Sequence, residues 1–531
     1  MHEILTLQLG HPANYLATHF WNTQESYFDY GASEEPLTID HDIHFRAGQG
    51  PKGEDTYTPR TLIYDLKGGF GGLRKWGGLY DQGDIDPASQ DLWDGSVVKQ
   101  QDKPISQSAY QKALDDLEQP PKLSSQAVRY WSDFSRVFYH PRSIIQINDY
   151  ELGSSILPFE KWVCGEQLFS ELDKDHDILD RDIRPWAEEC DQVQAIQVFA
   201  SADDAWGGFA SRYVESLRDE YGKTPLWFWG LEEQAGQGQR AKQSIRTVNI
   251  AQSLQAISTL ASMYIPLAVP KYAPAYVGLD LSSQWHVSGL VSMAVESITL
   301  PSRQKAGSMG RGLLGDLEVA LNSNGNQRIA ELQCSVVDPL TQHLERTPEA
   351  SQAAKDKRTA GSPLQQLAYE DEMEPGQSRL DMSFSSGQTT RTGLSLRQWE
   401  RRNHVFGKVE SIRGVPWEGH GLNDEGEANR RKRRRLGSLP TVERYYNALA
   451  YPLLDSFPEI LVGGGSSSKA AAIYASLSTT GQMSKWTKGL QNMVSRMVDV
   501  VEREALSNGL GEMAEAYEEG WDSGGDDDSS D

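Results

Sequence analysis

Cysteine is scarce in this chain. Three cysteines occur among 531 residues, and they are far apart: Cys164, Cys190 and Cys334. An odd, scattered set excludes a disulfide scaffold, and it lacks the closely spaced pairs of a cysteine-based zinc site. The remaining metal-like spacing, His41 and His44, lies in an acidic stretch where a lone pair of histidines is usually solvated. No metal site is therefore expected.

Long apolar runs and an N-terminal group of basic residues are also missing. The longest apolar stretch, at 260–269, is interrupted by polar residues and a proline, and a bilayer-spanning helix needs about 18 apolar residues. No Lys or Arg occurs between Met1 and Phe45, which excludes a signal peptide and an Arg-rich mitochondrial presequence. We expect synthesis and folding in the cytosol and no transmembrane segment. Association with the outer surface of an organelle stays open.

Positive charge is in the minority. The 51 Lys and Arg against 75 Asp and Glu give a net charge of −24. Because nucleic-acid affinity comes chiefly from Lys and Arg displacing counterions, no nucleic-acid partner is expected. The basic run Arg430–Arg435 is an exception to this balance. One interpretation is a nuclear localisation signal or a patch that binds an anionic surface, and the other is a solvated run of charges in a loop. The sequence favours neither interpretation over the other.

Strand and helix signals alternate over residues 1–260. Glu3–Leu9 alternates apolar and polar residues, as a strand does, and after a break at Gly10 apolar residues recur at helical spacing. Ala195–Ala200 and Pro225–Leu231 are apolar strands separated by a loop and a helix, which is the βαβ pattern of a parallel sheet. A further long helix is predicted over Asn249–Met263.

Composition divides the rest of the chain. Residues 261–440 are expected to form a second, smaller α/β domain with disordered insertions near 341–392 and 423–440, which are poor in large apolar residues. Residues 441–511 are expected to be helical and to include one long amphipathic C-terminal helix. Residues 512–531 carry nine carboxylates and no Lys or Arg, a composition typical of a disordered acidic tail.

Two strand-to-helix turns are candidate ligand sites, because open α/β sheets bind ligands at the carboxyl ends of their strands. Backbone N–H groups after Gly10 could hold a phosphate, although any such turn favours glycine. The loop Ser201–Gly208 carries Asp203 and Asp204, which repel phosphate unless a divalent cation bridges them. A polar loop is the preferred interpretation there.

Several segments resemble tubulin. The opening MHEILTLQLGHPANYLATHFW resembles the tubulin opening through Gln8, Gly10, Asn14 and Trp21. The strand at Pro59–Leu66 resembles a tubulin strand, and Asp65 occupies the position of the aspartate in that strand. The segments EECD…QAIQVF and LRDEY resemble the surroundings of the tubulin glycine-rich signature, and LSTTGQMSKWTKGL resembles its C-terminal helix region.

The opening together with SAYQKALDDL at Ser108–Leu117 resembles the Misato family, which is related to tubulin and FtsZ. This resemblance implies an α/β fold: a tubulin-like doubly wound parallel sheet, a second smaller α/β domain, C-terminal helices and an acidic tail. It also implies a role in mitochondrial partitioning, morphology and mitochondrial DNA inheritance. The implied location is the mitochondrion, on its outer surface because a presequence is missing, and also the cytoplasm. Implied partners are proteins, either cytoskeletal or folding machinery.

The resemblance also marks positions that would contact GTP if a nucleotide binds. They are Gln8, Gly10, Asn14, Asp65, Gly207, Gly208 and Asn249. Two departures count against binding. Asp203 and Asp204 stand where tubulin has a bare glycine-rich loop, and Lys67 replaces a carboxylate that helps to organise magnesium.

We therefore expect no catalytic residues and no bound cofactor, with GTP as the open possibility. The preferred function is that of a non-enzymatic, tubulin-related protein of mitochondrial inheritance. The alternatives are an active GTPase that self-assembles as tubulin does, and a cytosolic assembly factor for cytoskeletal proteins.

Overall fold

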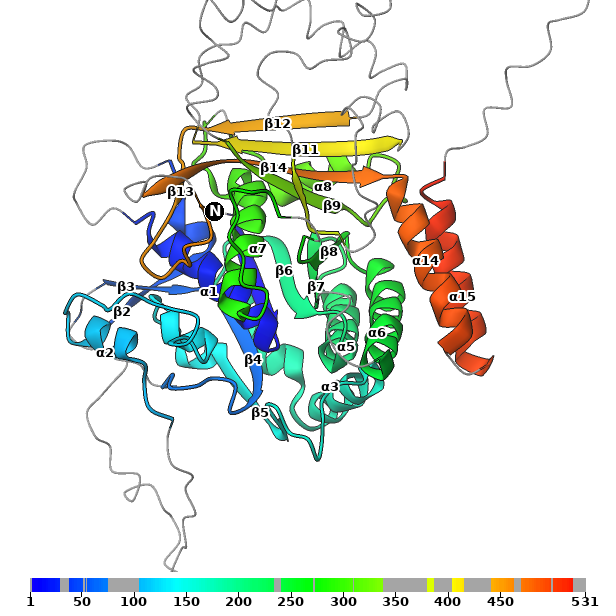
Figure 1. Ribbon diagram of the computed structural model, residues 1–531, viewed down its shortest axis with the longest axis horizontal. Helices are drawn as coiled ribbons and strands as arrows, with labels where there is room; N and C mark the ends of the chain where they lie inside the picture. The colour runs from blue at the N-terminus through cyan, green and yellow to red at the C-terminus, as the bar shows by residue number, and fades with distance from the viewer. Residues whose placement is uncertain are drawn as a thin grey trace, which may run out of the picture.

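The computed structural model describes most of the chain. Its described part contains two large β-sheets with packed helices and a C-terminal pair of helices (Figure 1). The described residues are 2–28, 38–50, 53, 55–74, 105–233, 240–270, 273–308, 310–337, 380–385, 404–414, 441–462, 469–497 and 500–518.

The central sheet has six strands in the order β5-β4-β1-β6-β7-β8, and every neighbouring pair is parallel. Strands β4 and β5 lie on one side of β1, and strands β6, β7 and β8, which come later in the chain, lie on its other side. The sheet is therefore doubly wound, as predicted, with its topological switch point between β1 and β6. The strands are β1 (Glu3–Leu9), β4 (Thr61–Lys67), β5 (Ile144–Glu151), β6 (Val193–Ser201), β7 (Leu226–Glu232) and β8 (Met263–Ala268).

Helices cover both faces of this sheet. The inner strands are therefore buried at nearly every position. Alternate residues belong to different cores: Ile4 packs with the cluster that contains α1 and α7, whereas Leu5 and Leu7 pack with the cluster that contains α5 and α6. This is the period of two that a strand imposes. The covering helices are α1 (His11–Glu25), α3 (Trp162–His176), α5 (Ala205–Glu220), α6 (Arg240–Ser258) and α7 (Gln284–Thr299).

Two element boundaries differ from the sequence prediction. The expected loop Ser201–Gly208 is shorter, because the Asp204 side chain accepts a hydrogen bond from the Trp206 N–H at 2.8 Å and so starts helix α5 at Ala205. The expected helix over Asn249–Met263 instead ends at Ser258, because Met263 begins β8 and pairs with β7.

A second sheet lies across the other side of α7 (Figure 1), in the order β10-β9-β14-β11-β12. Strand β14 is antiparallel to both of its neighbours, and β12 is parallel to β11. Its strands are β9 (Glu331–Val337), β10 (Met382–Ser383), β11 (Val405–Arg413), β12 (Thr441–Asn447) and β14 (Ala470–Thr480), with β13 (Tyr451–Pro452) paired to β14.

This sheet corrects two expectations. Residues 441–480 contain strands where helices were expected, because β14 is buried along almost its whole length between β9 and β11. Part of the expected disordered insertion 341–392 is ordered: Leu380, Met382 and Phe384 are buried, and β10 pairs with β9. The rest of that insertion and residues 423–440, with the basic run Arg430–Arg435, lie outside the described residues.

The C-terminal region forms two packed helices, α14 (Gln482–Met497) and α15 (Val500–Glu515), where one long helix was expected. Helix α15 continues into the expected acidic tail, because Ala514 and Tyr517 are buried and the Tyr517 hydroxyl donates to the Ile329 carbonyl at 2.9 Å. Residues 519–531 lie outside the described part. No helix within the described ranges has the length and apolar character needed to cross a membrane.

Smaller elements complete the described fold: β2 (Phe45–Gln49), β3 (Asp55–Pro59), α2 (Ala109–Asp115), α4 (Arg184–Ala187) and α8 (Leu314–Leu321). A buried ion cluster joins α7 to the second sheet. Glu296 of α7 contacts Arg303 just beyond that helix and Arg413 of β11, and all three side chains are almost fully buried. This cluster fixes α7, and with it one wall of the site described next.

Candidate functional site

The candidate site lies at the switch point, where the loops after β1 and β6 meet at the carboxyl ends of the strands. Gly10 turns the chain from β1 into α1 with a φ of 96°, a conformation that favours glycine. The Trp206 ring from the first turn of α5 packs directly on this turn. A Cβ atom on Gly10 would lie only 2.6 Å from the indole, so the two first turns are in close contact through a bulky apolar side chain.

Trp206 is held in place by other aromatic rings. It is 3% exposed, and its ring centre lies 5.4 Å from those of Phe159 and Phe209. The indole thus belongs to the core beneath the switch point. The sequence has this tryptophan where tubulin has a bare glycine loop, but nothing local to it indicated that its ring packs on Gly10.

The carboxylate of Asp65 is fully buried beside the Gly10 turn and is surrounded by donors. Its Oδ2 accepts hydrogen bonds from Asn14 Nδ2 at 3.0 Å and Trp131 Nε1 at 3.0 Å, and it lies 3.1 Å from His11 Nδ1. Its Oδ1 accepts from the Leu66 N–H at 2.9 Å. Because a carboxylate has about four acceptor positions, these contacts occupy Oδ2 and one position of Oδ1, and they leave the carboxylate poorly suited to a metal ion. Lys67, two residues on, is exposed at the end of β4.

Gln8 and Asn14 are also engaged within the protein. The Gln8 Nε2 donates to Thr61 Oγ1 at 2.8 Å, and the Asn14 Nδ2 donates to the Tyr64 carbonyl at 3.2 Å as well as to Asp65. Among the described residues, Gln8 Oε1 and Asn14 Oδ1 are buried without a hydrogen-bond partner. Both of these atoms are acceptors, whereas phosphate oxygens require donors.

Gly207 and Gly208 lie inside helix α5, where they allow helices to pack closely. A Cβ on Gly208 would lie 1.9 Å from the Trp162 carbonyl oxygen of α3, and one on Gly207 would lie 2.1 Å from Ser253 Oγ of α6. Gly165 of α3 makes the reciprocal approach, because a Cβ there would lie 1.7 Å from the Ala205 carbonyl oxygen. The described conformation thus explains these glycines by helix packing.

Asn249 ties three segments together through its amide. Its Oδ1 accepts from the Trp162 N–H at 3.1 Å, and its Nδ2 donates to the carbonyls of Glu160 at 2.7 Å and Asp203 at 2.9 Å. The predicted site residues therefore fall into two groups. Gln8, Gly10, Asn14 and Asp65 surround the β1 turn, and Gly207, Gly208 and Asn249 lie on the β6 side.

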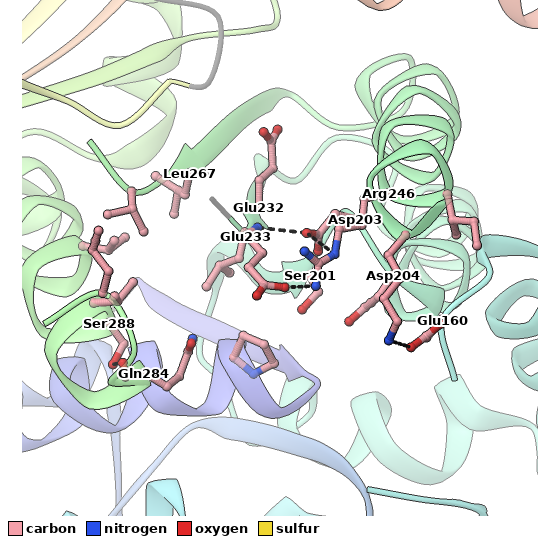
Figure 2. A pocket seen from close by; sticks show the side chains of 18 of the residues that line it. Glu160, Ser201, Asp203, Asp204, Glu232, Glu233, Arg246, Leu267, Gln284 and Ser288 are labelled. Atoms are coloured by element: carbon pink, nitrogen blue, oxygen red, sulfur yellow. Dashed lines mark hydrogen bonds and ion pairs between the residues drawn. The ribbon is translucent and has the colours of Figure 1, made fainter. Parts of the chain in front are cut away.

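A cavity of about 400 Å³ opens beyond the carboxyl ends of β6, β7 and β8. Five carboxylates line it against two cationic side chains, and its other walls are largely apolar. Figure 2 shows Asp203, Asp204 and Glu160 on one side of the cavity, with Leu267, Gln284 and Ser288 across the cavity from them. The charged lining residues are Glu160, Asp203, Asp204, Glu232, Glu233, Lys242 and Arg246.

Two of these carboxylates are poorly compensated. Asp203 Oδ2 accepts one hydrogen bond, from the Glu233 N–H at 2.9 Å, and lies 3.9 Å from Arg246 Nε. Burial raises the pKa of Asp203 to about 6, although that hydrogen bond and Arg246 oppose the shift. Burial, and then the charge of Asp203, hold the pKa of Asp204 well above its usual value. The cavity thus disfavours additional negative charge.

Two family models match this chain. A Misato Segment II tubulin-like domain matches residues 2–116, and a tubulin domain matches residues 120–304. Together they span the central sheet and the switch point. The resemblance to tubulin that the sequence suggested is therefore confirmed for the part of the chain that contains the candidate site.

Full-length relatives extend the match. The chain is 45% identical to Protein dml1 of Aspergillus niger, over 99% of this chain and 100% of the relative. It is 43% identical to Protein dml-1 of Neurospora crassa over 99% of both chains, and 34% identical to Protein dml1 of Schizosaccharomyces pombe over 62% of this chain and 72% of that one. The chain belongs to the Misato/Dml1 family of tubulin-related proteins.

Proposed function

We propose that this protein is a non-enzymatic member of its family that uses the tubulin-like sheet as a scaffold in mitochondrial partitioning, morphology and mitochondrial DNA inheritance. The observation that carries the non-enzymatic part is the packing of Trp206 on Gly10 beside two poorly compensated carboxylates. GTP hydrolysis requires donors around the phosphates, magnesium and an oriented water.

The switch point supplies few of these requirements. Its first helical turns are in contact through an indole, and most acceptor positions of the Asp65 carboxylate are taken by internal donors. Each unit negative charge placed about 4 Å from a phosphate charge costs roughly 4 kcal/mol at an effective dielectric constant near 20. One or two neutral hydrogen bonds, each contributing about 1 kcal/mol, do not offset that cost. The residues therefore do not fit a magnesium–GTP complex.

The biochemical test is a calorimetric titration of the full chain with GTP and magnesium, together with phosphate release over a range of protein concentrations. We expect weak or no binding and no hydrolysis above background. Micromolar binding would refute the proposed loss of nucleotide binding. Turnover that rises with protein concentration would favour a self-assembling GTPase instead.

The mitochondrial part rests on the family resemblance and needs a test in cells. Depletion of the protein should fragment or cluster mitochondria and increase the loss of mitochondrial DNA, and the wild-type chain should restore both. The rescue should also succeed with Asp204→Asn, which removes a charge but keeps an oxygen that can cap α5. Normal mitochondrial shape and DNA content after complete depletion would contradict the proposed role.

A further inference from the structure

Helix α14 differs in charge from the chain as a whole. It contains Lys485, Lys488 and Arg496 and no Asp or Glu, whereas the whole chain has a net charge of −24. All three cationic side chains are exposed. With 3.6 residues per turn they fall within an arc of about 80° around the helix axis. They therefore form one stripe, the basic face of α14.

The other sides of α14 are packed against neighbouring helices. Met483 and Val494 are buried in the core that also contains residues of α6. A second side contacts α15, where the Gln491 side chain donates to the Ser507 carbonyl at 2.8 Å. Figure 1 shows α14 and α15 side by side next to α6. The basic face belongs to neither of these packed sides.

The positive charge of this face is only partly compensated by described residues. Lys488 pairs with Glu518, and about half of each side chain is exposed. Arg496 forms no ion pair with another described residue. A further cation lies near the same end of the helix, because Arg503 of α15 donates to the Ser495 carbonyl at 3.3 Å. Such a surface attracts an acidic partner.

An acidic segment of the same chain begins beside the basic face. Glu518 is the last described residue, and its Oε1 contacts Lys488 and lies 3.5 Å from Ser484 Oγ in the first turn of α14. The 13 residues that follow, 519–531, include six Asp or Glu and no Lys or Arg. An extended chain spans about 3.3–3.6 Å per residue, so 13 residues cover about 40 Å. Lys488 and Arg496 are only about 12 Å apart along the helix, which is well within that reach.

We propose that the basic face of α14 is a docking surface for the acidic segment 519–531 of the same chain. Carboxylates of the segment contact Lys485, Lys488 and Arg496 and so extend the ion pairing that Glu518 begins. Single exposed ion pairs are weak, but a short tether at Glu518 keeps the segment at an effective concentration in the millimolar range. The docked segment keeps other anionic partners away from this face. The contact does not depend on nucleotide binding or on the mitochondrial role.

The test is a competition between the segment and a free copy of it. A fluorescein-labelled peptide of residues 519–531 is titrated into the full chain at about 0.05 M salt, where exposed charges are little screened, and its fluorescence anisotropy is measured. The same titration is made with a full-length variant whose segment is neutral. Its substitutions are Glu519→Gln, Asp522→Asn, Asp526→Asn, Asp527→Asn, Asp528→Asn and Asp531→Asn.

The neutral-segment variant should bind the peptide at least about tenfold more tightly than the parent, because the tethered segment of the parent competes at a millimolar effective concentration. Raising the salt to about 0.5 M should weaken peptide binding to the variant at least about tenfold, since the contacts are exposed ion pairs.

Substitutions on α14 locate the surface. In the neutral-segment variant, Lys485→Gln, Lys488→Gln and Arg496→Gln together should weaken peptide binding at least about tenfold, because three charge-assisted contacts are lost. If this triple variant fails to fold, Arg496→Gln alone should still weaken binding severalfold.

The matched control removes three exposed cations from other parts of the chain. It combines Lys112→Gln, Lys122→Gln and Lys174→Gln, and Lys122 pairs with an exposed glutamate as Lys488 does. The control should leave peptide affinity unchanged.

Four outcomes would overturn the proposal. They are peptide binding to neither protein, equal affinity of the parent and the neutral-segment variant, an equal loss of affinity in the α14 and control variants, and concentration-dependent dimerisation of the parent in sedimentation that the neutral segment abolishes. The last outcome would assign the contact to the acidic segment of a second copy.

Discussion

Asp65 and Asp203 lie on opposite sides of the same switch point and show two ways of burying a carboxylate. Asp65 is surrounded by Asn14, His11, Trp131 and a backbone N–H. Asp203 has one close backbone donor and a distant arginine, and burial raises its pKa to about 6. Both are largely shielded from solvent, so burial alone does not distinguish them. The number of donors distinguishes a carboxylate that is part of a satisfied network from one whose charge is poorly compensated.

The buried glutamate between the two sheets follows the first pattern. Burial alone would raise the pKa of Glu296, but Arg413 and Arg303 together hold it below its usual value. The Tyr27 hydroxyl also donates to Glu296 Oε1 at 2.9 Å. Asp65 and Glu296 therefore stabilise tertiary structure, whereas the β6 side of the switch point carries unbalanced charge next to a cavity.

The largest expected effect comes from Asp65→Ala. Removing the carboxylate leaves the buried indole N–H of Trp131 without its acceptor and leaves the Asn14 amide with only the Tyr64 carbonyl as an acceptor. The expected loss is roughly 3–5 kcal/mol of unfolding free energy, as for other broken buried polar networks. Urea denaturation measures it, with Asp219→Ala as an exposed control that should change stability by less than about 0.5 kcal/mol. If Asp65→Ala lowered the unfolding free energy as little as Asp219→Ala, the hydrogen bonds of Asp65 would not stabilise the fold, and Asp65 would not differ from Asp203 in this respect.

A smaller effect is expected for Gly208→Ala on the β6 side. The new methyl group would lie 1.9 Å from the Trp162 carbonyl oxygen, so α3 and α5 must separate. Overpacking of this kind costs typically about 1–3 kcal/mol. Gly222→Ala is the matched control, because its Cβ would meet its nearest neighbour, the Arg218 carbonyl oxygen, at 3.5 Å. Similar melting temperatures for the two variants would argue against close helix packing as the reason for Gly208.

The sequence predicted the parts of this structure that depend on local pattern. The buried strands Glu3–Leu9 and Ala195–Ala200 and the turn at Gly10 were readable because strand burial and glycine turns have short-range signals. The helical prediction for the region of strand β14 was wrong, since an alanine- and serine-rich run that is buried on both faces shows little alternation.

The site was less accessible to prediction because it depends on contacts between distant segments. The sequence identified Asp203 and Asp204 as unfavourable for phosphate, and the structure places both at the edge of an acidic cavity. It contained no local indication that Trp206 packs on Gly10, far away in the chain, or that α7 forms the apolar wall. Such pairings follow from the sheet order, which local periodicity does not specify.

The smallest expected effect concerns the pH dependence of stability at Asp203. Its pKa is about 6 in the folded protein, against 3.8 for an unperturbed aspartate such as one in the unfolded chain. At pH 7 the folded state therefore bears the cost of an ionised, buried carboxylate, and Asp203→Asn should be more stable than the parent. As the pH falls through about 6, the folded parent takes up a proton and the advantage of the variant shrinks until the pH approaches 3.8.

The difference between variant and parent reports on Asp203 together with Asp204, because the charge of Asp203 also raises the pKa of Asp204. Both proteins contain His19, whose pKa is lowered to about 3 by burial, so both lose stability in acid as the unfolded histidine binds a proton. Subtraction removes that shared loss. We expect the advantage of Asp203→Asn to be about 1 kcal/mol greater at about pH 7 than at about pH 5, measured by urea denaturation at each pH. A constant difference across this range would mean that burial does not raise the pKa of Asp203 in the folded protein, and the acidic cavity would lose its main source of unbalanced charge.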